Sequence, residues 1–415
     1  MKKIHLYIFL AIVAIIVLAI IFIPNIVSQQ SSSTTGQPAT STASSTQNTL
    51  TEMGPKAEHV STPKVVKGIY MSACYAGSKD LREGLVNMIE KTELNSIVID
   101  IKDYSGYISF LPNDSWKGDL SPNCNAKDMQ DFIKELHQKN IYVIGRITTF
   151  QDPYYSKKNP EFAIKKKNDP SKIWTDKKGL SYLDPESKEV WDRTAKLAED
   201  SYNAGFDEIN FDYIRYPSDG DIQNMLISNS EGKTKSDILE SFFKYLHDRL
   251  SPQGIKMSAD LFGLTTVAED DMGIGQILEK TMPYFDYVCP MVYPSHFAKN
   301  FHGYKDPNKN VYGVIQYSMS TAVGRAEATS TKFDFIGAVP IVSNFVSTST
   351  KQSQLYEKTV YDKNKLRPWL QDFSFGGTYG PTEVRSQIQA TYDVGLNSWL
   401  LWSASNVYTE AALGK

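Results

Sequence analysis

Three aspartates stand where predominantly apolar segments of the sequence come to an end: Asp212, Asp260 and Asp372. Hydrolysis of a glycosidic bond needs two carboxyl groups, one ionised and one kept protonated by its surroundings. We therefore expect Asp212 to act as nucleophile or base and Asp260 as general acid, with Asp372 stabilising the sugar or the charge. The alternative interpretation is a network of buried ion pairs that only stabilises the fold.

Other polar and aromatic side chains occupy the same segment ends. In the segment 208–216, Glu208, Asn210 and Asp212 share one face because alternate residues of a strand point the same way. A buried aspartate needs a cationic partner, and Arg215 or Lys102 is the expected partner of Asp212. The full predicted substrate-binding set is Asp100, Lys102, Arg146, Asn210, Arg215, Tyr293, His296, Gln371 and Trp402.

These residues need a scaffold, and the apolar pattern predicts one. Short apolar segments alternate with amphipathic helices, which indicates parallel β/α units. The strongest helical stripe covers 238–250, with Ser236 as the expected N-cap. No Gly-x-Gly-x-x-Gly motif opens the first helix, which disfavours a doubly wound sheet. The eight predicted strands are 65–72, 96–102, 141–150, 208–216, 256–262, 287–293, 366–373 and 398–403.

Eight such units predict an α/β fold, a (β/α)₈ (TIM) barrel, over residues 64–415, with the active site at the carboxyl ends of the strands. Residues 333–364 are expected to form an insertion before the seventh strand. The long loop 151–189 carries several aromatic residues. They are expected either to form a sugar-binding lip or to pack the loop onto the barrel rim.

The N-terminus has the pattern of a membrane anchor. Lys2 and Lys3 precede an apolar run over residues 6–23, long enough to cross a bilayer, and no small-x-small cleavage site follows it. We predict a transmembrane helix within 1–27 and a disordered Ser/Thr-rich linker over 28–63. The lysines favour a cytoplasmic N-terminus and an extracytoplasmic domain. A cleaved signal peptide is the alternative, and it would also export the domain.

Composition excludes several classes of function. The net charge of -3 argues against nucleic-acid binding. None of the six histidines lies in a metal-binding motif, so no metal or other cofactor is expected. Neither a Gly-x-Ser-x-Gly elbow nor a P-loop occurs.

The sequence has three cysteines. Cys289 lies in an apolar run and is expected to be buried, whereas the sequence leaves open whether Cys74 pairs with Cys124.

Residues 205–217, with the sequence GFDEINFDYIRYP, resemble the signature of the family described as "putative glycosyl hydrolase domain" (DUF4015). The segments 67–70, 98–103, 258–263, 290–296, 367–373 and 399–402 are also similar to that family. The resemblance implies a barrel of the glycosidase superfamily. The expected activity is hydrolysis or transglycosylation of an extracellular or cell-surface polysaccharide, and the alternative is a non-catalytic barrel that binds glycan.

Barrels that resemble α-amylases carry an Asp after strand four, a Glu after strand five and an Asp after strand seven. Asp212 and Asp372 match this arrangement by position. Asp260 departs from it, since its side chain is one methylene shorter than the usual Glu. Glu208 and Asp100 are therefore the alternatives for the acid role.

Overall fold

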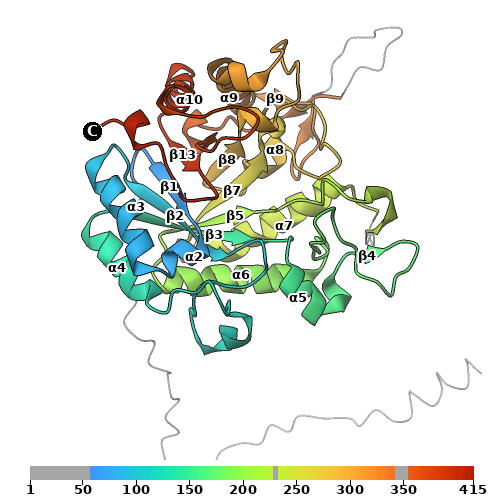
Figure 1. The fold of residues 1–415 in the computed structure, drawn as a ribbon. Helices are drawn as coiled ribbons and strands as arrows, with labels where there is room; N and C mark the ends of the chain where they lie inside the picture. The colour runs from blue at the N-terminus through green and yellow to red at the C-terminus, as the bar shows by residue number, and fades with distance from the viewer. Residues whose placement is uncertain (1–56, 228–231, 342–353) are drawn as a thin grey trace, which may run out of the picture. The chain divides into compact units, whose positions relative to one another are not determined.

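The computed structural model describes residues 57–227, 232–341 and 354–415 (Figure 1). The predicted anchor and most of the predicted linker lie outside these ranges and stay predictions. Within the described ranges, no helix combines the length and the apolar character needed to cross a membrane. Residues 57–63 contact the folded domain, because the Val60 amide donates to Asp207 Oδ1 at 2.8 Å and the Thr62 hydroxyl lies 3.0 Å from the Tyr142 hydroxyl.

The predicted barrel is confirmed. A closed barrel of parallel strands lies at the centre of the described chain, and each of the eight predicted segments contributes one strand. Every strand is surrounded by neighbours on both sides, which explains the continuous apolar runs in the sequence. In order around the barrel the strands are β1 (Lys67–Met71), β13 (Trp399–Trp402), β12 (Trp369–Gln371), β8 (Tyr287–Met291), β7 (Lys256–Phe262), β5 (Glu208–Asp212), β3 (Tyr142–Thr148) and β2 (Ser96–Lys102).

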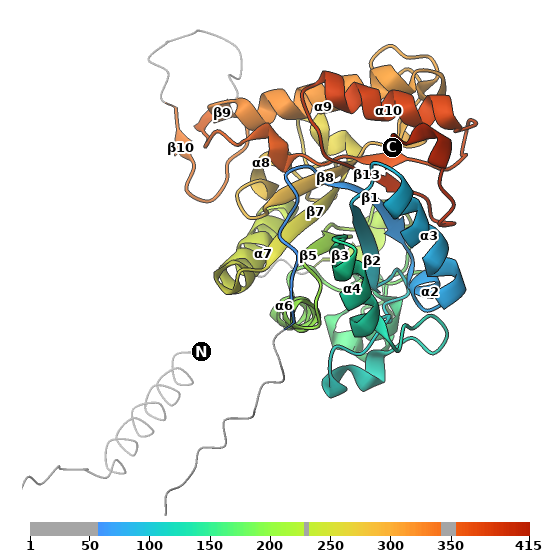
Figure 2. The same cartoon turned by 90° about the vertical axis from the view of Figure 1, so that its left-hand side faces the viewer.

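Helices surround the barrel and bury their apolar stripes against it (Figures 1 and 2). The N-cap of α7 is Thr234, not the predicted Ser236. The Thr234 hydroxyl accepts from the Asp237 amide and the Asp237 carboxylate accepts from the Thr234 amide, so two free N–H groups are satisfied together. The helices are α2 (Ala73–Ala76), α3 (Lys79–Lys91), α4 (Met129–Gln138), α5 (Pro153–Lys158), α6 (Lys188–Asn203), α7 (Lys235–Leu250), α8 (Leu278–Thr281), α9 (Val311–Glu327) and α10 (Pro381–Asp393).

In the described part of the chain, two small sheets lie outside the barrel. β9 (Ser330–Thr331), β10 (Val339–Pro340) and β11 (Tyr356–Glu357) form an antiparallel sheet at the predicted insertion before the seventh barrel strand. β4 (Lys165–Lys166), which lies within the long loop 151–189, pairs with β6 (Met225–Leu226).

The aromatic residues of that loop include two that pack inward. Trp174 and Tyr182 are almost fully buried, and they form a small cluster with Ile164 and Met225. Packing of the loop, rather than a sugar-binding lip, is therefore the correct interpretation for this pair.

The amino end of the barrel interior is closed by an ion pair. Arg367 Nη1 donates to Glu208 Oε1 at 2.8 Å, and the Tyr142 hydroxyl donates to Glu208 Oε2 at 3.1 Å. Both members of the ion pair are fully buried. The predicted inward direction of Glu208 is confirmed, but its burial with Arg367 at this end of the barrel removes it as a candidate acid.

The cysteines follow the expectation in part. Cys289 is buried, as its apolar surroundings predicted. Cys74 and Cys124 are joined by a disulfide, which links the segment after β1 to the loop before α4.

Candidate active site

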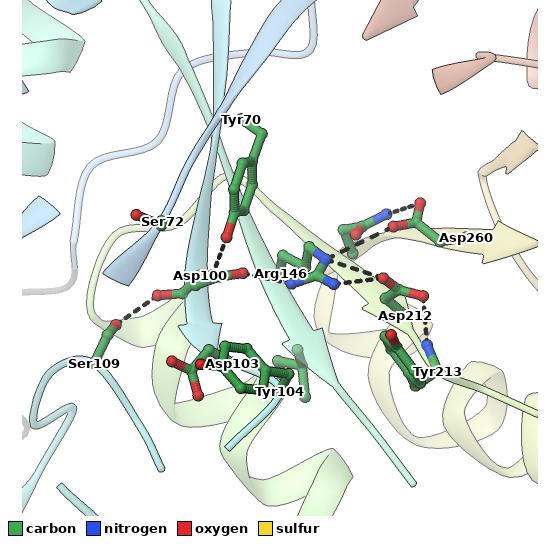
Figure 3. A network of polar contacts seen from close by, with 12 residues as sticks. Tyr70, Ser72, Asp100, Asp103, Tyr104, Ser109, Arg146, Asp212, Tyr213 and Asp260 are labelled. Atoms are coloured by element: carbon green, nitrogen blue, oxygen red, sulfur yellow. Dashed lines mark hydrogen bonds and ion pairs between the residues drawn. The ribbon is translucent and has the colours of Figure 1, made fainter. Parts of the chain in front are cut away.

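Arg146 on β3 is the centre of a charged network inside the carboxyl end of the barrel. It stands opposite Asp100 of β2 in the strand register. Its Nη1 donates to Asp100 Oδ1 at 2.6 Å, while Nη2 and Nε donate to Asp212 Oδ2 at 2.5 and 3.2 Å. Figure 3 shows the guanidinium between the two carboxylates. Because all three side chains are buried, these charge-assisted bonds are stronger than they would be in water.

The two cations expected to pair with Asp212 do not do so. Lys102 binds Asp152 Oδ2 at 2.7 Å instead. The reason is a register shift between Asp100 and Lys102, since such an irregularity redirects a side chain that simple alternation would place inside. Arg215 lines the site, but its guanidinium donates to groups of its own loop. The cationic partner of Asp212 is Arg146.

A strained turn follows Asp212. The carboxylate Oδ1 accepts from the backbone amide of the next residue, Tyr213, at 2.5 Å. Tyr213 has φ of 51°, a left-handed conformation that non-glycine residues rarely adopt and that is typical of functional sites. This turn brings Tyr213 to the site, although regular alternation along the strand would point it away from the face that carries Asp212. The sequence offers no signal for it, because alternation holds only while the strand continues.

Asp260 on β7 has different surroundings from Asp212. Its Oδ1 accepts from two neutral donors, Asn210 Nδ2 and Trp369 Nε1, each at 2.8 Å. Burial, reinforced by the nearby charge of Asp212, raises the pKa of Asp260 well above its usual value. These surroundings favour the protonated form of Asp260.

The carboxyl groups of Asp212 and Asp260 lie close together. Oδ2 of Asp212 is 3.2 Å and Oδ2 of Asp260 is 4.0 Å from the same nitrogen, Nε of Arg146. The two oxygens are thus no more than about 7 Å apart, a limit that does not exceed the separations of glycosidase carboxyl pairs. The structure brings together the two acids that the sequence analysis placed at the ends of neighbouring strands.

Both acids face a cavity of about 390 Å³ at the carboxyl end of the barrel. Arg146 forms part of its wall, and the Trp402 ring stacks on Tyr70 with centroids 4.0 Å apart. Seven predicted residues line the cavity: Arg146, Asp212, Arg215, Asp260, Tyr293, His296 and Trp402. Sequence reasoning missed the other lining residues: Tyr213, Phe262, Gly263, Leu264, Met291 and Phe297. The cavity thus combines acidic groups with a largely aromatic and apolar wall.

Asp372 does not belong to this cavity. Its Oδ2 accepts from the Thr409 amide at 2.8 Å and its Oδ1 from the Thr409 hydroxyl at 2.6 Å. Burial raises its pKa. The expected catalytic role of Asp372 is therefore not supported, because both of its oxygens hold the C-terminal segment against β12.

Asp100 and Gln371 support the site without lining the cavity. The Tyr70 hydroxyl donates to Asp100 Oδ2 at 2.5 Å, and burial raises the pKa of Asp100 to about 6. Asp100 thus holds Arg146 from the side opposite Asp212. Gln371 Oε1 accepts from the Ser295 amide at 3.2 Å, which fixes the loop that carries His296. Asn210 acts through its hydrogen bond to Asp260.

Within the described ranges, no group of three or more His, Cys, Asp or Glu side chains is arranged to hold a metal ion.

Comparison with known proteins gives one family. The model of the family described as "Putative glycosyl hydrolase domain" (DUF4015) matches residues 68–362 and 338–408. No curated protein sequence matches the chain.

Comparison with solved structures gives one with a TM-score above 0.5 among the three described next, and it shares the fold. The PgaB (BpsB) glycoside hydrolase domain from Bordetella bronchiseptica is 10% identical, with a TM-score of 0.54 over 82% of this chain and 94% of that one. A hypothetical protein from Ruminiclostridium thermocellum ATCC 27405 is 33% identical, with a TM-score of 0.42 over 50% of this chain and 98% of its own. The spore cortex-lytic enzyme SleL from Bacillus megaterium QM B1551 is 10% identical, with a TM-score of 0.42 over 86% and 73% of the two chains.

Proposed function

The chain belongs to the putative glycosyl hydrolase domain family (DUF4015), and from this premise we propose that it hydrolyses glycosidic bonds with Asp212 and Asp260 as its catalytic pair. The observation that carries the proposal is the contrast between the two acids. Asp212 accepts two hydrogen bonds from a guanidinium. Asp260 accepts hydrogen bonds from neutral donors, and its Oδ2 lies 4.0 Å from that guanidinium. Opposite surroundings for two neighbouring carboxyl groups are what acid–base hydrolysis of a glycoside requires.

The roles of the two residues follow from their charges. Protonated Asp260 donates its proton to the glycosidic oxygen as the bond from that oxygen to the anomeric carbon breaks. Asp212, paired with Arg146, acts as the base that takes a proton from the attacking water, or as the nucleophile that forms a glycosyl ester with the anomeric carbon. In the second route water then cleaves the ester, which restores the Asp212 carboxylate, and Asp260 takes the proton of that water. In either case water supplies the hydroxyl of one product and the leaving sugar keeps the proton from Asp260. The guanidinium of Arg146 orients Asp212.

The cavity wall is suited to a sugar ring. Trp402 and Tyr293 present aromatic surface, and a pyranose offers an apolar C–H face together with hydroxyl groups at its edge. Arg215 supplies a cation that can donate to sugar hydroxyls. We therefore propose that the sugar next to the scissile bond binds in this cavity.

We also propose that the substrate is an extracellular or cell-surface polysaccharide and that the domain is tethered outside the membrane. The sequence pattern of residues 1–63 supports this location. The Cys74–Cys124 disulfide supports it too, since disulfides persist mainly in oxidising compartments. An external protease should release the domain from intact cells that carry the full chain. A domain that is cleaved only after cell lysis would contradict the location.

The proposed activity is tested by product release from soluble starch, hydroxyethyl cellulose, glycol chitin and laminarin. Asp212→Asn should abolish release by the full chain. Asp372→Asn is the matched control, because its amide can still bond both groups of Thr409 outside the cavity. Release that persists in Asp212→Asn would refute the assignment. Binding of a glycan without any cleavage by the wild-type chain would identify a glycan-binding barrel instead.

A further inference from the structure

Several large apolar side chains stay exposed at the carboxyl end of the barrel. Tyr104 follows β2, Phe375 follows β12 and Val407 follows β13, and each is more than three-fifths exposed. Leu264, after β7, is partly exposed and lines the cavity itself. Exposed apolar groups gathered at the end of a barrel that carries its active site indicate a binding surface rather than a packing defect.

Phe375 is the member of this group that is joined to the cavity through other rings. Its ring centroid lies 5.9 Å from that of His296. The His296 ring lies 5.5 Å from that of Tyr293, and both of these residues line the cavity. The three side chains therefore form one continuous surface that leads out of the cavity.

The turn that presents Phe375 is packed rather than free. Gly376 follows it with φ of 68°, and a Cβ atom there would lie 2.9 Å from Asn308 Nδ2. Asn308 is itself held, because its Oδ1 accepts from the Tyr379 hydroxyl at 2.9 Å. The backbone around Phe375 is thus fixed by close contacts while 62% of the residue remains exposed.

The size and chemistry of this surface fit a sugar better than a protein. A stable protein interface needs about 800 Å² on each partner, far more than one phenyl ring provides. A pyranose has an apolar face that matches one aromatic ring, with hydroxyl groups at its edge. His296 can hydrogen-bond such hydroxyls. Its Nδ1 is 2.9 Å from the Ser295 hydroxyl, and among the described residues no hydrogen bond occupies its Nε2.

We infer that Phe375 and His296 form a second sugar subsite, for the unit joined to the cavity sugar on the side away from the scissile bond. The substrate is then a glycan chain whose binding extends beyond the two sugars that the scissile bond joins. This inference deepens the proposed function and rests on it for the cleavage step. The binding step can be measured without cleavage.

The test uses affinity electrophoresis of the full chain in gels that contain each of the four polysaccharides named above. Phe375→Ala should raise the dissociation constant for the retarding glycan about 3- to 10-fold, the range for one aromatic contact. Phe375→Trp should restore it. Leu81→Ala is the control, because Leu81 is also exposed but lies on the outer helix α3. Its mobility should match that of the wild type.

Cleavage gives a second measurement. The ratio of kcat/KM for a hexasaccharide to that for a disaccharide should fall about 3- to 10-fold in Phe375→Ala, because only the longer chain reaches the subsite. Two outcomes would overturn the subsite. In the first, a glycan retards the wild type and Phe375→Ala equally; in the second, none of the glycans retards the wild type. Retardation that depends on Phe375 without any cleavage would refute the proposed hydrolysis and leave the subsite standing.

Discussion

Asp260→Asn separates the chemistry of Asp260 from its contribution to the fold. Only Oδ1 of Asp260 accepts hydrogen bonds in the described structure, from Asn210 and Trp369. Oδ2 lies 4.0 Å from Arg146 Nε. An asparagine of the same shape can keep its oxygen at the Oδ1 position, which retains both bonds, and place its NH₂ group where Oδ2 stood. The substitution therefore changes the acidity of the group and little else.

The expected change in stability depends on pH with a definite sign. The pKa of Asp260 is raised by folding, so its contribution to stability is fully present below the pKa of the unfolded chain. That contribution is lost as the pH rises through the folded pKa. Asparagine stays neutral throughout, so below the unfolded pKa the free energy of unfolding of the variant should lie within about 1 kcal/mol of the wild-type value. Toward neutral and alkaline pH the variant should become the more stable of the two, because only the wild type loses this contribution.

The expected change in activity is large, because an amide cannot deliver a proton to the leaving oxygen. A general acid contributes about 10²- to 10⁴-fold, and that factor should disappear for an oligosaccharide substrate. A dinitrophenyl glycoside of the same sugar leaves without protonation, so its cleavage should fall far less. The assay compares kcat/KM for the two substrates and the melting temperature at pH 5 and pH 8.

Two results would refute this reasoning. An equal loss of kcat/KM on both substrates would show that Asp260 is not the proton donor. A melting temperature lowered by more than about 10 °C would show that the hydrogen-bond assignment at Oδ1 is wrong, since 1 kcal/mol corresponds to roughly 2–4 °C in a domain of about 200 residues and less in a larger one.

Three further predictions concern buried charges. In Asp212→Asn the side-chain NH₂ group must face either the Arg146 guanidinium or the Tyr213 amide, both of which are donors. Urea unfolding should therefore show a loss of about 1–3 kcal/mol in the free energy of unfolding. A variant as stable as the wild type would contradict this prediction. The pKa of Asp100 is raised to about 6, so the wild type should lose on the order of 3 kcal/mol of stability as the pH rises from 4 through 6. Asp100→Asn should lack this pH dependence. Parallel curves of unfolding free energy against pH for the two proteins would contradict this prediction. Glu208→Gln leaves the buried charge of Arg367 without a counter-ion and should cost about 3–5 kcal/mol in chemical unfolding; a loss below 1 kcal/mol would show that the pair adds little.

The barrel was predictable because its signals are local. Each strand is a short apolar run bounded by polar residues, and each long helix has an apolar stripe of its own. Both patterns arise within a few residues and need no knowledge of the rest of the chain. The inward direction of Asn210 and Asp212 follows equally from the alternation of side chains along one strand. For this reason the sequence alone identified most of the residues that line the cavity.

The partners of those residues were not predictable in the same way. The assignment of Arg215 or Lys102 to Asp212 was wrong because a register shift in β2 redirects Lys102 and because Arg215 turns into its own loop. Tyr213 was missed because its left-handed backbone breaks the alternation of the strand.

The sequence by itself determined the eight strands, their order along the chain and the acids at their ends. Only the tertiary structure decided which acids meet. Asp372 is removed from the site by Thr409, which lies 37 residues further along the chain. The pKa of Asp260 is raised because strands from distant parts of the chain exclude water around it and place Asp212 nearby. Strand formation depends on neighbours in sequence, whereas the charge state of a buried carboxyl group depends on register, loop conformation and burial, which only the closed barrel sets.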